Sequence, residues 1–193
     1  RAKQCMSYDR NSDKIKPQSV IEMVHDITSG DAYVTSDVGQ HQMAACRYSD
    51  FTQTRSNVTS GGLGPMGFAL PAAIGAKMGS PKREVVAIIG DGGYQMTIQE
   101  LGTIFQTKVP VKIVVLNNGF LGMVRQWQEL IHGGRYSESY TESLPDFVKL
   151  AESFGIVGLR AEKSSEVDKT IKEMIKIKKP VLLDMVVDQH ENC

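Results

Sequence analysis

The sequence has little cysteine, no excess of charge of either sign and no long apolar run. Its 193 residues carry 22 Lys and Arg against 22 Asp and Glu, so the basic surface of a nucleic-acid-binding protein is not expected. No apolar run reaches the length that spans a membrane. The three cysteines, Cys5, Cys46 and Cys193, lack metal-ligand spacing, and their odd number favours reduced thiols. We therefore expect neither a nucleic-acid partner nor a membrane partner.

The length fits one domain with a core of its own. Residues 1–16 are polar and mixed in charge, which indicates a linker or the tail of a preceding domain. Residues 17–193 form the expected domain. Because the chain begins at Arg1 without a methionine and stops just after a strand-like run, we expect a piece of a longer protein.

Strand-like and helix-like segments alternate along the chain. The expected strands are 32–37, 57–60, 85–89, 111–116, 156–159 and 181–187. The expected helices follow Pro17, Phe68, Gly93, Gly122, Asp146 and Ser164. Residues 38–42 read as a turn, and 133–143 as a mobile surface loop. This alternation predicts an α/β fold: a doubly wound, mostly parallel sheet with helices on both faces.

Two apolar runs end in polar clusters at the centre of the chain. Asp91 follows the run 85–89, and Asn118 follows the run 111–116. Both strands of a βαβ unit end at one edge of the sheet, where open α/β sheets bind ligands. Asp91, Asn118 and the main-chain carbonyl of Phe120 would give Mg²⁺ three of about six oxygens, with a diphosphate and water supplying the rest. Separately, Asp91 could cap a helix and Asn118 could simply form a turn.

Glycines surround Asp91, and other glycines precede the helix expected after Phe68. Gly92 and Gly93 would let backbone N–H groups approach a phosphate at a helix N-terminus. Residues 62–67 match G-x-G-x-x-G, which imitates a dinucleotide-binding fingerprint. Pro65 within it has no N–H to offer a pyrophosphate, so a tight turn is an equal alternative. A noncatalytic nucleotide-binding module remains one hypothesis.

The Gly-Asp-Gly and Asn-Asn clusters, at this interval, resemble the signature of thiamine-diphosphate-dependent enzymes. Further stretches are similar to the catalytic (large) subunit of acetolactate synthase, also called acetohydroxyacid synthase. They are 39–43 (GQHQM), 59–67 (TSGGLGPMG), 70–76 (LPAAIGA), 116–118 (LNN) and 122–127 (GMVRQW). The resemblance covers nearly the whole chain from Lys16 onward. It implies the C-terminal domain of that subunit, with a thiamine-diphosphate-binding fold.

The resemblance also implies roles for individual residues. Asp91, Asn118 and the Phe120 carbonyl match the Mg²⁺ ligands. Contacts to thiamine diphosphate are implied for Gln40, His41, Gly64, Met66, Gly92, Gly93, Phe120, Leu121 and Met123. Among these, Gly64 would accept a hydrogen bond from the aminopyrimidine, and Met66 would hold the cofactor bent. Met123 and Trp127 would shape the substrate pocket. Without the family, both would be read as ordinary core residues.

The implied reaction joins two pyruvates, or pyruvate and 2-oxobutyrate, with loss of CO₂. The products are 2-acetolactate and 2-aceto-2-hydroxybutyrate, in branched-chain amino-acid biosynthesis. The family's activating glutamate belongs to a domain that this chain does not match, so no catalytic residue is assigned here and the piece alone is expected to be inactive. FAD, a homo-oligomer and a regulatory small subunit are implied partners. The implied location is the cytoplasm, or an organellar stroma in a eukaryote.

The sequence departs from the family pattern at three positions, Ala44, Pro65 and Gly93. The family often has Trp, Thr, and Ser or Ala there, so individual contacts differ while the metal and cofactor pattern stays intact. A related thiamine-dependent decarboxylase, oxidase or carboligase is the alternative enzyme. The segment Gln126-Trp127 favours acetolactate synthase over it.

Overall fold

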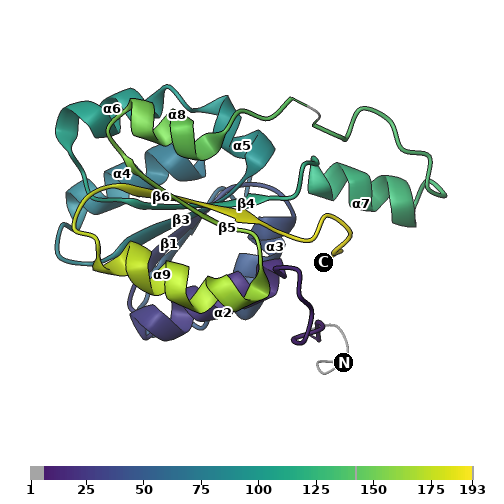
Figure 1. The fold of residues 1–193 in the computed structure, drawn as a ribbon, viewed down its shortest axis with the longest axis horizontal. Coiled ribbons are helices and arrows are strands. Elements are labelled where there is room, and N and C mark those ends of the chain that lie inside the picture. Colours follow the sequence, from purple (N-terminus) through teal and green to yellow (C-terminus); the bar gives the residue numbers. More distant parts are fainter. Residues whose placement is uncertain (1–6, 142, 193) are drawn as a thin grey trace.

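The computed structural model describes residues 7–141 and 143–192. One sheet runs through the molecule, with helices on both of its faces (Figure 1). The strands are β1 (Tyr33–Ser36), β2 (Asn57–Thr59), β3 (Val85–Gly90), β4 (Lys112–Asn117), β5 (Val157–Ala161) and β6 (Val181–Val186). The helices are α2 (Pro17–Thr28), α3 (Gln40–Tyr48), α4 (Ala69–Gly79), α5 (Asp91–Met96), α6 (Glu100–Thr107), α7 (Gly122–Leu130), α8 (Phe147–Ser153), η1 (Ser164–Glu166) and α9 (Val167–Lys176).

The six strands pair in the order β2-β1-β3-β4-β6-β5, and every pairing is parallel. The doubly wound α/β prediction is confirmed. β3 and β4 lie side by side at the centre of the sheet, with Gly90 opposite Leu116. The loops that follow these two strands therefore start from neighbouring points on the carboxyl edge of the sheet, where the polar clusters were expected.

Alternate residues of each central strand belong to different cores. Val85, Ala87 and Ile89 pack under α4, α5, α6 and α8. Val86 and Ile88 pack against α2 and α9 on the other face. Because both faces are covered, the strands are apolar from Val85 to Ile89 in β3 and from Ile113 to Leu116 in β4. α7 and the chain after it project beyond the carboxyl end of the sheet (Figure 1).

One sequence expectation about local structure was wrong. Residues 38–42 were read as a turn, but α3 begins at Gln40, directly after Gly39. Gly39 has φ of +150°, and a Cβ there would lie 2.6 Å from the His41 ring. The expected loop at 133–143 is irregular over its described residues, apart from a bridge between Phe120 and Tyr140.

The residues before α2 contact the domain. Ile15 is completely buried and forms a parallel bridge with Val187. The domain boundary at 16/17 stays a prediction. Cys46 is an exposed free thiol, while Cys5 and Cys193 lie outside the described residues. Within 7–141 and 143–192, the helices are too short or too polar to cross a membrane.

Candidate functional site

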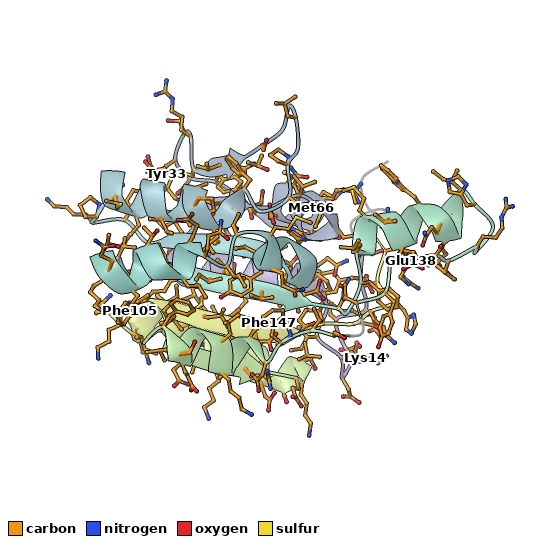
Figure 2. The ribbon with its side chains drawn as sticks, turned by 90° about the horizontal axis from the view of Figure 1, so that it is seen from above. Lys14, Tyr33, Met66, Phe105, Glu138 and Phe147 are labelled. Carbon is orange, nitrogen blue, oxygen red and sulfur yellow. The ribbon has the colours of Figure 1, made fainter. Side chains whose placement is uncertain are left out.

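A cavity of about 260 Å³ opens at the carboxyl edge of the sheet. All twelve residues to which the sequence assigned a cofactor, metal or substrate role line it: Gln40, His41, Gly64, Met66, Asp91, Gly92, Gly93, Asn118, Phe120, Leu121, Met123 and Trp127. They come from the starts of α3 and α5, from the loop after β4, from the glycine-rich turn and from α7. Figure 2 shows the labelled Met66 toward the end of the molecule that carries α7, and Phe105 at the opposite end. The role of each residue stays a prediction.

Asp91 is the buried charge of this cavity. Its side chain is 1% exposed, and its two carboxylate oxygens accept hydrogen bonds from Gly92 N at 2.6 Å and Gly119 N at 2.7 Å. Burial raises the pKa of Asp91 to about 6, although these backbone N–H groups act in the opposite direction. A cation beside the carboxylate would favour its charged form.

Asn118 and Phe120 follow β4 at the same point of the edge. Asn118 Oδ1 accepts a hydrogen bond from Phe120 N at 3.1 Å, which folds the chain into a tight turn after the strand. Gly119 in this turn has φ of +70°, a conformation that glycine adopts without strain. The turn therefore brings the Asp91 carboxylate and the Asn118 amide to one wall of the cavity.

His41 presents an unsatisfied nitrogen at the cavity. Its Nε2 atom is buried and has no hydrogen-bond partner among the described residues. Burial lowers the pKa of His41 to about 4, against the opposing charge of Asp37. The ring packs on Gly90, where a Cβ would come within 2.9 Å of it. The neutral imidazole has one donor and one acceptor, so this nitrogen is available to a polar ligand.

Asp37, which the sequence reading missed, holds the glycine-rich turn at the site. Its carboxylate is completely buried and accepts hydrogen bonds from Gly67 N at 3.0 Å and Phe68 N at 2.9 Å. These contacts tie the end of β1 to the start of α4 and place Gly64 and Met66 at the cavity. An acidic residue at the end of an apolar strand was the signal that could have identified it.

The glycines of the site leave room that a side chain would fill. A Cβ on Gly92 would lie 2.8 Å from Leu121 and 3.7 Å from Met66 Cε, both of which line the cavity. A Cβ on Gly93 would lie 2.0 Å from Asp37 Oδ2, so the glycine that departs from the family pattern accommodates the Asp37 carboxylate. The backbone at the start of α5 thus stays accessible to a ligand.

The predicted Mg²⁺ ligands in this cavity are one carboxylate, one amide and one main-chain carbonyl. Among the residues described, no three His, Cys, Asp or Glu side chains gather as a metal cluster. The predicted Mg²⁺ ligands do not need one, because Mg²⁺ is bound by few carboxylates together with ligand phosphates and water. The residues present therefore fit a magnesium diphosphate.

The family is decided by a match over most of the chain. Residues 37–185 match the family described as thiamine pyrophosphate enzyme, C-terminal TPP binding domain. The chain belongs to this family. The matched stretch begins at Asp37, directly after β1, and covers the ends of β3 and β4, so it includes every residue of the predicted cofactor and metal sites.

Named relatives of this TPP-binding domain include acetolactate synthase subunits. The chain is 52% identical over its whole length to the isozyme 3 large subunit of Escherichia coli K12, and 51% identical to the large subunit of Haemophilus influenzae. It spans about a third of the length of these relatives, 34% in each.

A solved structure has a similar fold. The thiamine diphosphate-dependent 4-hydroxybenzoylformate decarboxylase of Rhodococcus jostii RHA1 matches 92% of this chain and 33% of its own, with a TM-score of 0.83 and 28% identity.

Proposed function

We propose that this domain binds thiamine diphosphate through Mg²⁺ at the carboxyl edge of its sheet. Asp91, Asn118 and the Phe120 carbonyl would hold the cation, and Gln40, His41, Gly92 and Gly93 would contact the diphosphate. The single observation that carries the proposal is the convergence of all twelve predicted residues on one cavity around the buried Asp91 carboxylate. The match to a TPP-binding family supports the identity of the ligand.

The intact protein that contains this domain is proposed to be an acetolactate synthase. The support is the 52% identity to a subunit of that name over this entire chain. Its substrates would be 2-oxoacids: pyruvate alone gives 2-acetolactate, and pyruvate with 2-oxobutyrate gives 2-aceto-2-hydroxybutyrate. When bound, thiamine diphosphate supplies an electron sink for decarboxylation and carbon–carbon bond formation.

The residues of this domain would bind, orient and shield the cofactor. Met66 and Leu121 would exclude water from its middle, and Gly64 would accept a hydrogen bond from its aminopyrimidine. Met123 and the half-exposed Trp127, neighbours on one face of α7, would form the wall against the second 2-oxoacid. The group that activates the cofactor would come from outside this domain.

Further components follow from the same assignment. FAD would bind mainly outside this domain, the full-length subunits would form a homo-oligomer, and a regulatory small subunit could join them. The protein would work in the cytoplasm, or in the stroma of an organelle in a eukaryote, where branched-chain amino acids are made. Each of these properties belongs to the intact protein.

Two measurements test the proposal. Calorimetry should detect thiamine diphosphate binding to the domain with Mg²⁺ and not with EDTA. The intact subunit should convert pyruvate to 2-acetolactate, whereas the domain alone should not. Tight NAD binding without Mg²⁺, in place of thiamine diphosphate binding, would reject the cofactor assignment and favour a nucleotide-binding module.

A second candidate is another thiamine-diphosphate-dependent decarboxylase, oxidase or carboligase. The observation that supports this candidate is the similarity of the fold to a thiamine diphosphate-dependent decarboxylase, with a TM-score of 0.83. Product analysis on the intact subunit separates the two. Acetaldehyde or acetate from pyruvate, without acetolactate, would support this second candidate.

A further inference from the structure

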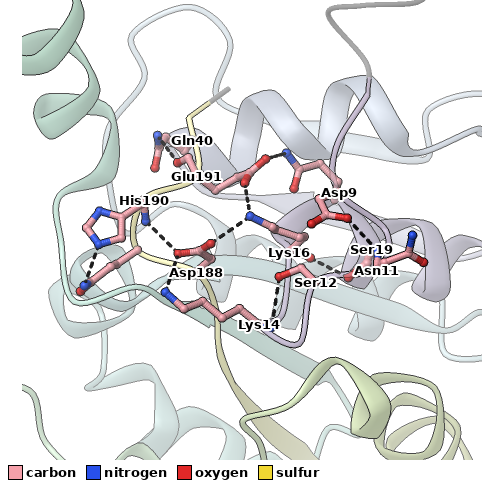
Figure 3. A network of polar contacts seen from close by, with 12 residues as sticks. Asp9, Asn11, Ser12, Lys14, Lys16, Ser19, Gln40, Asp188, His190 and Glu191 are labelled. Carbon is pink, nitrogen blue, oxygen red and sulfur yellow. Dashed lines mark hydrogen bonds and ion pairs between the residues drawn. The ribbon is translucent and has the colours of Figure 1, made fainter.

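The chain after β6 is held against the chain before α2 by a partly buried cluster of charges (Figure 3). Lys16 Nζ lies 2.9 Å from Asp188 Oδ2 and 2.6 Å from Glu191 Oε2. The Lys16 side chain is 13% exposed, and the two carboxylate side chains are 11% and 17% exposed. Ion pairs shielded from water to this degree are stronger and less screened by salt than surface pairs. We call residues 188–192 the 188–192 segment.

Glu191 is held at both its side chain and its backbone. Its side chain receives Lys16 at one carboxylate oxygen and Gln18 Nε2, at 2.9 Å, at the other. Its main-chain carbonyl accepts a hydrogen bond from Gln40 Nε2 at 3.1 Å. Figure 3 shows Glu191 between Lys16 and Gln40. One residue thus joins the start of α2 to the first turn of α3.

Gln40 also contacts α7. Its Nε2 atom also donates to Gln126 Oε1 at 2.8 Å, a contact between two buried side chains. The Gln40 amide packs on the turn that starts α7, since a Cβ on Gly122 would lie 2.2 Å from Gln40 Oε1. Gln40 and Gly122 both line the cavity, so two of its walls meet at this amide.

We infer that Lys16 and Glu191 are positioning residues for the cofactor site. The clamp formed by Lys16, Asp188 and Glu191 fixes the 188–192 segment, and the Glu191 carbonyl then fixes the Gln40 side chain. Gln40 in turn sets the position of the α3 N-terminus against α7. Lys16 lies outside the cavity lining, so it acts on the site through these contacts. The inference rests on the proposed thiamine diphosphate site.

The first test needs no cofactor. Lys16→Met removes both ion pairs of Lys16 and leaves Glu191 without a cation, while Asp188 keeps Lys14 at 3.5 Å. Hydrogen exchange of the backbone amides in α3 and α7 should become about tenfold faster in this variant, because the contacts that hold both helices at the cavity loosen. Exchange in β3 and β4 should not change. A purely structural role would instead speed exchange in the strands as well.

Lys16→Arg and Lys77→Met are the matched variants. Lys16 borders a cavity of about 230 Å³, which gives a longer arginine room, and arginine keeps the positive charge. Lys16→Arg should therefore restore wild-type exchange in α3 and α7. Lys77 is also buried and lies 3.9 Å from Glu84, before the amino end of β3. Lys77→Met should lower the melting temperature and leave exchange in α3 and α7 unchanged relative to the strands.

The second test titrates thiamine diphosphate with Mg²⁺ into the intact subunit. Lys16→Met should weaken binding about tenfold or more, and Lys77→Met less than about twofold. Wild-type affinity in Lys16→Met, together with wild-type exchange in α3, would overturn the inference while leaving the proposed function standing. If the wild-type subunit itself bound no thiamine diphosphate, the proposed function would fail and the inference with it.

Discussion

The two ends of the central strands each bury an ionisable side chain, but the groups that surround the two side chains differ. Asp91 follows β3 at the carboxyl edge, and Lys112 begins β4 at the amino edge; each is 1% exposed. Lys112 Nζ donates to the carbonyls of Ile177 and, at 3.0 Å, Lys179, which follow α9. The Asp91 carboxylate opens onto a cavity of about 260 Å³.

Burial opposes the charge at both ends. It lowers the pKa of Lys112 to about 8 and raises that of Asp91 to about 6. At the amino edge the protein's own carbonyls accept hydrogen bonds from the lysine, so the amine of Lys112 satisfies buried groups of the fold itself. At the carboxyl edge the Asp91 carboxylate lines the cavity, and under the proposed function its charge would bind a cation. Buried ionisable groups are thus distinguished by what remains beside them, more than by burial itself.

The strongest challenge to this contrast is Asp91→Asn. The amide oxygen can accept from only one of Gly92 N and Gly119 N, and the amide NH2 then faces the other N–H, so the fold should persist with a modestly lower melting temperature. Affinity for thiamine diphosphate with Mg²⁺ should fall at least about 100-fold, because the cation loses its carboxylate ligand. Calorimetry measures this. Asp184→Asn is the control, since Asp184 is equally buried and does not line the cavity.

Lys112→Met should affect stability and not binding. It leaves the carbonyls of Ile177 and Lys179 without their donor, which costs about 1–3 kcal/mol in the free energy of unfolding. Urea denaturation gives this value. Cofactor affinity should stay within about twofold of wild type, since the site lies at the other end of the strands. A large loss of affinity would remove the distinction between the two ends.

The titration of Lys112 should make the free energy of unfolding depend on pH. Its pKa falls from 10.5 in the unfolded chain to about 8 in the folded protein. Between these values the unfolded state binds more protons, so stability should rise with pH from about 8 to 10.5, by on the order of 1–3 kcal/mol. The difference in unfolding free energy between wild type and Lys112→Met isolates this contribution. A difference that stayed flat with pH would show that Lys112 does not titrate as described.

Tyr94→Phe should produce the smallest change. The Tyr94 hydroxyl, like His41 Nε2, is buried and has no hydrogen-bond partner within the described part of the chain. Unlike His41, Tyr94 does not line the cavity; its ring packs edge-on against Phe147 at 5.4 Å. Removing the hydroxyl should change stability by less than about 1 kcal/mol, or raise it slightly. Affinity for thiamine diphosphate should not change. Thermal melting measures the change in stability, and calorimetry measures the affinity.

The elements of the central unit could be predicted because their signals are local. Val85–Gly90 is apolar at every position but the last, which is typical of a strand buried on two faces. The helix of α3 was missed, because Gly39 before it and the short segment after β1 read as a turn. Asp37 was missed for another reason: its partners Gly67 and Phe68 lie 30 and 31 residues away.

The sequence by itself determined the class of fold and which side chains gather at the cavity. Apolar runs of strand length alternate with helices, and polar residues with glycines stand where two runs end, so Asp91 and Asn118 had to share an edge. Tertiary structure alone decided the strand order, the burial of Lys112 beneath the end of α9, and the link from Lys16 through Glu191 to Gln40. Such contacts join residues up to 175 positions apart, and local periodicity carries no information about partners at that distance.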